Sequence, residues 1–137
     1  MAATAAKLAL GTSITLATVP IEEVESIGGP KMKAALVDCT NLGSPSGWAE
    51  YIVGVLDGGD IPIGGNFTNA TGQAALRTAL GAAAQAVAIL LPGSQPAAGH
   101  FNFNGVVTDF ALDFKTKSQI TFTATIRVTG PVTFSTS

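Results

Sequence analysis

The sequence predicts a mainly β protein, a β-sandwich or barrel with one short α-helix, in a single domain over residues 1–137. Two observations set this fold class: apolar and polar residues alternate in several segments, and only one segment has helical spacing. A third concerns the surface. Hydrophobic residues make up 47% of the chain and charged residues only 12%. Because an isolated soluble domain normally carries more charge, we expect other subunits to cover much of this surface.

The clearest strand spans residues 120–128, where apolar residues alternate with threonine and arginine. Residues 110–114 alternate in the same way, and the polar stretch 115–118 between the two segments predicts a hairpin. The phenylalanines of residues 101–103 have the opposite phase. Since Gly105 lies between the two phases, we predict a β-bulge beside this glycine.

Further strands are predicted where the alternation is weaker. They lie within residues 8–16, 32–39, 61–67 and 87–91. The last of these segments is almost entirely apolar, which is typical of a strand buried on both faces.

One helix is predicted to begin at Thr71, as its N-cap, and to end at Gly81. An apolar stripe at helical spacing would face the core, with Gln73 and Arg77 on the other side. The stripe consists of Ala75, Leu76, Ala79 and Leu80.

The segment 40–59 is predicted to be a long loop, and the first residues of the chain are expected to be flexible. A loop of this length in a compact domain is usually functional. It contains the only tryptophan and the only tyrosine of the chain, residue types that anchor protein interfaces. The alternative is that Trp48 folds back onto the core. The candidate interface residues are Pro45, Trp48, Tyr51 and Ile52.

Catalytic and metal chemistry is not indicated. With Cys39 and His100 as the only residues of their kinds, the chain offers no intramolecular disulfide, no cysteine metal cluster and no evident nucleophile and base. The sequence 57–60 is interpreted as a polar turn instead of a calcium loop. The glutamates of 22–25 are interpreted as a solvated edge. We therefore predict no enzyme activity, no cofactor and no metal site.

Charge and hydropathy exclude two further classes. The net charge of −2 and the pI near 5.1 provide no basic surface for nucleic acid. The longest apolar run, residues 79–91, is interrupted by Gln85 and is too short to span a bilayer, so no membrane partner is expected.

The segments 40–52 and 54–60 resemble the tail tube proteins of long-tailed, non-contractile bacteriophages. The likeness extends over roughly residues 12–134 and rests on the order and spacing of several motifs. Ser46 departs from the family pattern, which has a glycine there. The other similar segments are 72–80, 89–92, 103–110 and 128–134.

This resemblance implies a structural virion protein whose hexameric rings stack into a hollow tail tube that delivers DNA to the host. Strands of six subunits would join into an inner β-barrel. The implied partners are further copies of the chain, a tape measure protein in the lumen, and tail terminator and tail tip proteins, with DNA passing only transiently. The implied location is the virion tail, after assembly in the host bacterial cytoplasm.

Under this interpretation the polar face of the hairpin formed by residues 101–128 would line the lumen. The opposite orientation, toward outside solvent, stays open, because the polarity of a sheet face does not select a side. The lumen candidates are Asp109, Asp113, Thr121, Thr123 and Thr125. Two other functions also stay open: a secretion-system tube protein of the same fold, and a monomeric β-sandwich binding module.

Overall fold

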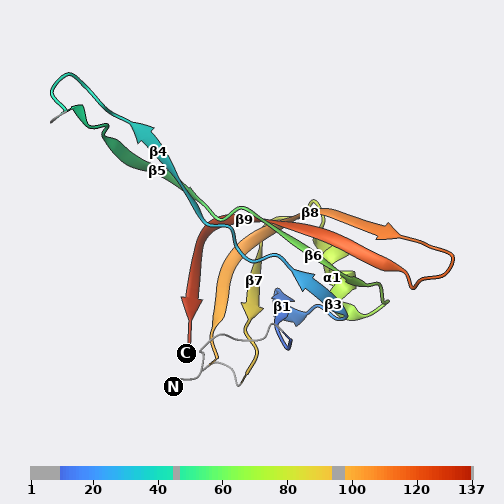
Figure 1. Ribbon diagram of the computed structural model, residues 1–137. Helices are drawn as coiled ribbons and strands as arrows, with labels where there is room; N and C mark the ends of the chain where they lie inside the picture. The colour runs from blue at the N-terminus through green and yellow to red at the C-terminus, as the bar shows by residue number, and fades with distance from the viewer. Residues whose placement is uncertain (1–9, 45–46, 94–97, 137) are drawn as a thin grey trace, which may run out of the picture.

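The computed structural model describes residues 10–44, 47–93 and 98–136 (Figure 1). The predicted mainly β fold with one short helix is confirmed. In chain order the elements are β1 (Ser13–Leu16), β2 (Val19–Pro20), β3 (Val24–Ile27), β4 (Lys33–Asp38), β5 (Tyr51–Asp57), β6 (Asp60–Asn66), α1 (Thr71–Ala79), β7 (Gln85–Leu90), β8 (His100–Asp113) and β9 (Thr121–Ser135).

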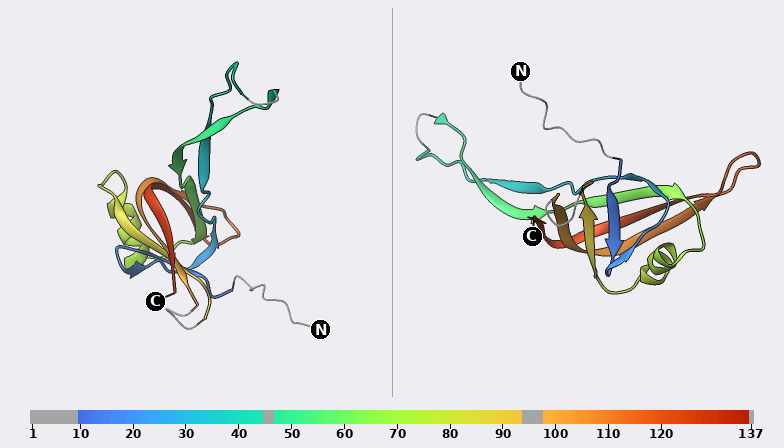
Figure 2. Two further views of the ribbon diagram at one scale, coloured as in Figure 1. Left: turned by 90° about the vertical axis from the view of Figure 1, so that its left-hand side faces the viewer. Right: turned by 90° about the horizontal axis from the view of Figure 1, so that it is seen from below.

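Seven strands form one antiparallel sheet in the order β2-β1-β7-β8-β9-β6-β3. The sheet curls on itself into a half-barrel, and α1 lies against its inner side (Figures 1 and 2). The remaining strands, β4 and β5, pair only with each other and project from the body as a separate ribbon (Figure 2). The molecule therefore consists of a curled body and a projecting hairpin.

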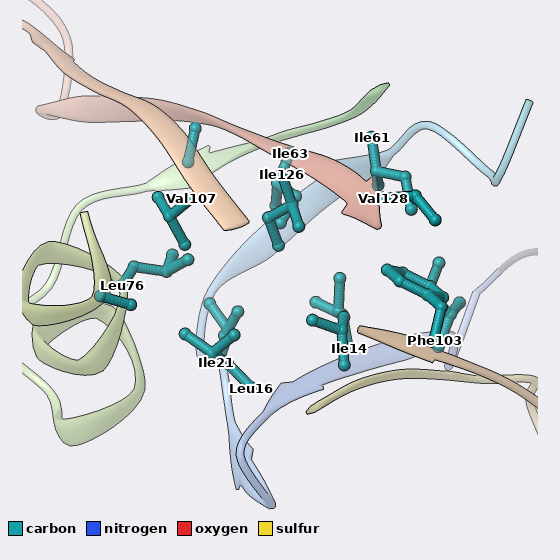
Figure 3. Close-up of a cluster of buried hydrophobic side chains, with 14 of the residues drawn as sticks. Ile14, Leu16, Ile21, Ile61, Ile63, Leu76, Phe103, Val107, Ile126 and Val128 are labelled. Atoms are coloured by element: carbon teal, nitrogen blue, oxygen red, sulfur yellow. The ribbon is translucent and has the colours of Figure 1, made fainter. Parts of the chain in front are cut away.

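The core lies inside the curl, where apolar side chains from the sheet and from α1 meet (Figure 3). It forms because alternate residues of each strand point to the same face. In β9 the predicted alternation is confirmed for four residues, which are buried while their neighbours are not. These four are Phe122, Ala124, Ile126 and Val128; Ile120 lies outside the strand and is exposed.

The predicted β8–β9 hairpin is confirmed, but the predicted position of the bulge is wrong. Val107 pairs with Ile126 and Asp109 with Thr125, so Thr108 is the extra residue on β8. Gly105 lies in regular pairing, where a Cβ would collide with the side chain of Ile126. Gly105 thus permits the side chain of Ile126 to pack closely against β8. The phase of the alternation along β8 changes three residues later, at Thr108.

The helix begins one residue earlier than predicted. Ala70 is the N-cap and makes no side-chain capping bond, so Thr71 is the first helical residue. The carboxylate of Glu22 accepts the backbone N–H of Gly72 at 3.1 Å. Glu22 is half-buried at the positive end of the helix, which corrects the interpretation for this residue, whereas Glu23 and Glu25 are exposed as expected. Gly81 follows the helix with φ of +77°, as its end requires.

Gln73 was expected on the outer side of the helix, but its side chain is 0% exposed. Its Nε2 donates to the backbone carbonyls of Glu22 at 2.9 Å and Asn66 at 2.8 Å. Its Oε1 accepts the backbone N–H of Thr68 at 2.9 Å. The amide can be buried because all three of these hydrogen bonds to backbone groups satisfy it.

Two predictions about local structure are corrected. Residues 51–57 form β5, so the connection expected to be a loop through residue 59 ends at residue 50. The predicted strand 87–91 is not fully buried on both faces: Val87 and Ile89 face the core, while Ala88 and Leu90 on the outer side are only half-buried. The first nine residues, expected to be flexible, lie outside the described part of the chain. Within that part, no helix is long and apolar enough to cross a membrane.

Candidate assembly surfaces

The projecting hairpin, which we define as residues 33–57, exposes every described residue of β4 and β5. Because neighbouring residues of a strand point to opposite faces, its large apolar side chains lie on both faces. They include Leu36, Val37, Tyr51, Ile52, Val53, Val55 and Leu56. A two-stranded ribbon is barely stable alone in water, and an apolar patch of this size marks a protein interface. The hairpin thus exposes apolar surface that its own chain leaves uncovered.

The base of the hairpin is fixed to the body by ionic and backbone contacts. Arg127 on β9 contacts Asp57 at 2.7 Å and Asp60 at 3.4 Å. The backbone N–H of Val128 donates to the carbonyl of Gly59 at 3.0 Å. The N–H of Gly59 and the guanidinium of Arg127 hold the pKa of Asp57 below its ordinary value. The polar turn predicted at 57–60 is therefore an anchor between the hairpin and the body.

The far end of the hairpin is ordered by hydrogen bonds among its own residues. The Ser44 hydroxyl donates to the Glu50 carboxylate at 2.9 Å, and the Glu50 N–H donates to Thr40 Oγ1 at 2.8 Å. Hydrogen bonds from the Thr40 side chain and backbone lower the pKa of Asp38. These contacts shape the end of the hairpin without support from the body.

Three of the four candidate interface residues lie on this hairpin. Trp48 is 74% exposed, so it does not fold back onto the core of its own chain. Tyr51 and Ile52 begin β5 and are also exposed. Pro45 lies outside the described residues. The structure brings the three described candidates to one end of the molecule, away from the curled body (Figure 1).

The five lumen candidates lie together on the face of β8 and β9 that points away from the core. Asp109 pairs with Thr125 and Asp113 with Thr121, while Thr123 lies between these pairs. Their side chains are exposed or half-buried. The same face of β9 continues to Arg127, which contacts Asp57 and Asp60 at the base of the projecting hairpin. This surface carries hydroxyls and carboxylates, and within the described residues no three His, Cys, Asp or Glu side chains are grouped to hold a metal ion.

A further exposed surface, missed by the sequence analysis, is the end of the β8–β9 hairpin, which we call the distal turn (residues 112–120). Phe114 is 67% exposed there, and Leu112 and Ile120 are also exposed. Lys115 and Lys117 lie on the same turn. The signal in the sequence was the alternation of 110–114, which continues beyond the point where the core can cover it.

Neither a family model nor a curated protein sequence matches this chain. Solved structures do. A chain of the virion of a native gene transfer agent particle has a TM-score of 0.79 and 18% identity, over 95% of this chain and 99% of the other. A chain of the tail of an empty gene transfer agent particle, computed with helical refinement and C6 symmetry, has a TM-score of 0.77 and 19% identity with the same coverage.

A third similar chain comes from the sheath-tube complex of an extracellular contractile injection system, PVC. It has a TM-score of 0.71 and 13% identity, over 90% of this chain and 87% of the other. The chain shares the fold of these tail and tube chains. This tail-tube fold was implied by the order and spacing of several motifs over roughly residues 12–134, and it is confirmed at identities too low to show a common function.

Proposed function

We propose that this chain is the structural subunit of a tail tube, whose hexameric rings stack into a hollow conduit that delivers DNA to the host. The observation that carries the proposal is the projecting hairpin, an ordered ribbon with exposed apolar side chains on both faces. Such a ribbon needs cover from another chain. The tail-tube fold and the tail with C6 symmetry among similar structures support copies of this chain as that cover.

Trp48, Tyr51 and Ile52 are proposed as anchors that contact an adjacent subunit or ring, together with Pro45. Aromatic residues that become fully desolvated dominate the binding energy of interfaces. The exposure of Trp48, Tyr51 and Ile52 in the single chain supports this role, because it leaves these three side chains available for a neighbour.

The face with Asp109, Asp113, Thr121, Thr123 and Thr125 is proposed to line the lumen, where β8 and β9 contribute to the inner barrel of six subunits. A net charge of −2 per chain makes every ring acidic. Protein contacts to DNA phosphates depend on lysine and arginine, so a wall with carboxylates and hydroxyls would let DNA pass without adhering. The opposite face of β8 and β9 is buried in the core of the same chain, so the polar face is the one free to line a lumen.

In such a tube the proposed further partners are a tape measure protein in the lumen and terminator and tip proteins at the ends. The proposed location is the virion tail, after assembly in the host bacterial cytoplasm. We propose a structural and not an enzymatic role.

Negative-stain microscopy of the concentrated protein tests the proposal. The expected result is rods or rings with sixfold symmetry and a central channel. A protein that stays monomeric at high concentration, with its apolar hairpin uncovered, would contradict it and favour a monomeric binding module.

A second candidate function is the tube of an injection or secretion system, supported by the similarity to the PVC sheath-tube chain. Both candidates predict rings, so the neighbouring genes discriminate between them. Capsid and tape measure genes favour DNA delivery, whereas genes of a membrane secretion complex or a contractile sheath favour delivery of proteins.

A further inference from the structure

We infer that Phe114 of one copy inserts into the apolar cleft at the base of the projecting hairpin of the next copy along the stack. The inference rests on the proposed tube, because the two surfaces meet only if copies stack head to tail.

The inserted residue lies at the end of the distal turn. Phe114 is 67% exposed, and Leu112 and Ile120 beside it are exposed as well. The apolar face of β8 and β9 continues here beyond the core of its own chain. An exposed aromatic residue with apolar neighbours at the tip of a ribbon has the composition of an interface anchor.

The receiving cleft lies where the hairpin joins the body. Its volume is about 300 Å³, which is within the range of pockets that bind small organic groups. Apolar side chains from the hairpin base and from the last part of β9 form most of its walls. These residues are Met32, Ala34, Leu56, Pro131 and Val132. Leu56 and Met32 are more than half exposed in the single chain, so a neighbour can still bury them.

The base of the projecting hairpin, where the cleft is formed, lies near the middle of the elongated molecule, and the distal turn lies at one of its ends (Figures 1 and 2). A chain therefore cannot fill its own cleft with its own Phe114. Contacts between two different surfaces of identical copies are heterologous, and they generate open stacks when the copies are related by translation along an axis. Each added copy would supply a new cleft for the following one.

Charge also favours this orientation. The distal turn carries Lys115 and Lys117 against Asp113, a net charge of +1. At the base of the projecting hairpin Lys33 offsets Asp57, which Arg127 also contacts, so the hairpin's net charge of −2 lies toward its far end, in Asp38 and Glu50. Opposite charges on two surfaces steer them together, whereas two distal turns or two hairpins would repel each other.

Cysteine cross-linking of the assembled protein tests the contact. In a Cys39→Ser background, which removes the only native thiol, the double variant Phe114→Cys with Met32→Cys is assembled and then oxidised by dissolved oxygen with a copper catalyst. Each disulfide forms as two thiols lose two protons and two electrons to oxygen. The expected result is a ladder of covalent multimers on a denaturing gel without reductant, because every copy carries one thiol of each kind.

Two controls accompany this variant. Phe114→Cys alone and Met32→Cys alone can give no product beyond a dimer. The pair Phe114→Cys with Leu80→Cys moves the second thiol to an exposed apolar position at the end of α1, and it should give no ladder. Tubes that form without a ladder from the Met32 pair, or with an equal ladder from the Leu80 pair, would overturn the inference and leave the proposed function intact.

A second measurement needs no introduced cysteine. Phe114→Ala should raise the protein concentration at which tubes form by tenfold or more, since truncating an interface anchor typically costs more than about 1.4 kcal/mol. Phe114→Leu should retain most of the assembly. Unchanged assembly of a folded Phe114→Ala protein would contradict the contact. Failure of the unaltered chain to form rings at all would instead contradict the proposed tube.

Discussion

The curled sheet and the projecting hairpin use similar residues for different purposes. In residues 121–128 of β9, apolar residues alternate with polar ones, and each apolar side chain there is buried within its own chain. In β4 and β5, apolar residues follow one another without alternation, and every side chain is exposed. Alternation thus marks a strand with one face on the core, whereas an uninterrupted apolar strand marks cover on both faces. In the described part of this chain nothing provides that cover, and we propose that another copy does.

The largest expected effect is a loss of stability of the curled body. Leu76→Ala, in the fully buried centre of α1, should lower the free energy of unfolding by about 2–5 kcal/mol, because it leaves a cavity in the core. Val53→Ala on the hairpin is the matched control and should change it by less than about 0.5 kcal/mol. Urea unfolding of the monomer measures both. Equal losses would mean that the hairpin contributes to the folding core.

A smaller loss is expected at Gln73. Gln73→Leu keeps the side chain's size but leaves the N–H of Thr68 and two backbone carbonyls without partners, at a cost of about 1–3 kcal/mol. Gln119→Leu, at an exposed position, is the control and should be near neutral. The same unfolding experiment applies. A stable Gln73→Leu protein would show that other contacts hold α1 against the sheet.

At Trp48 the effect should appear in assembly and not in folding. Trp48→Ala removes an exposed side chain, so the unfolding free energy should stay within about 0.5 kcal/mol, while tube formation should require at least roughly tenfold more protein. Light scattering and urea unfolding measure the two effects, with Trp48→Phe as the conservative control. Two results together would contradict the anchor role: Trp48→Ala unfolds the subunit, and the Trp48 fluorescence of the unsubstituted protein does not change when that protein polymerises.

The smallest effect concerns pH and the anchor at Asp57. Because the folded chain lowers the pKa of Asp57 from 3.8, the anchor is fully present above about that pH and is lost as the pH falls through the lower folded value. The anisotropy decay of Trp48 should therefore show a more mobile hairpin in strong acid. Asp57→Asn should show this mobility already at neutral pH. An identical acid transition in both proteins would exclude the anchor as its cause.

Several features could be predicted from the sequence because they depend on local pattern. The alternation of 120–128 predicted both the strand and its buried face, and the spacing around Leu76 predicted the helix and part of its inner side. The position of the bulge could not be predicted, since Gly105 has two possible roles and only its packing against Ile126 shows which applies. The motifs of 40–60 indicated the fold but not that residues 51–57 form a strand.

The sequence by itself determined the mainly β character, the single helix and the shortage of charge, because periodicity and composition are properties of neighbouring residues. Only the tertiary structure decided that Gln73 turns inward, that Arg127 ties the hairpin to β9 and that apolar residues at both ends of the molecule stay uncovered. These outcomes depend on residues that are far apart in the chain, and the curl of the sheet decides which of these residues come into contact.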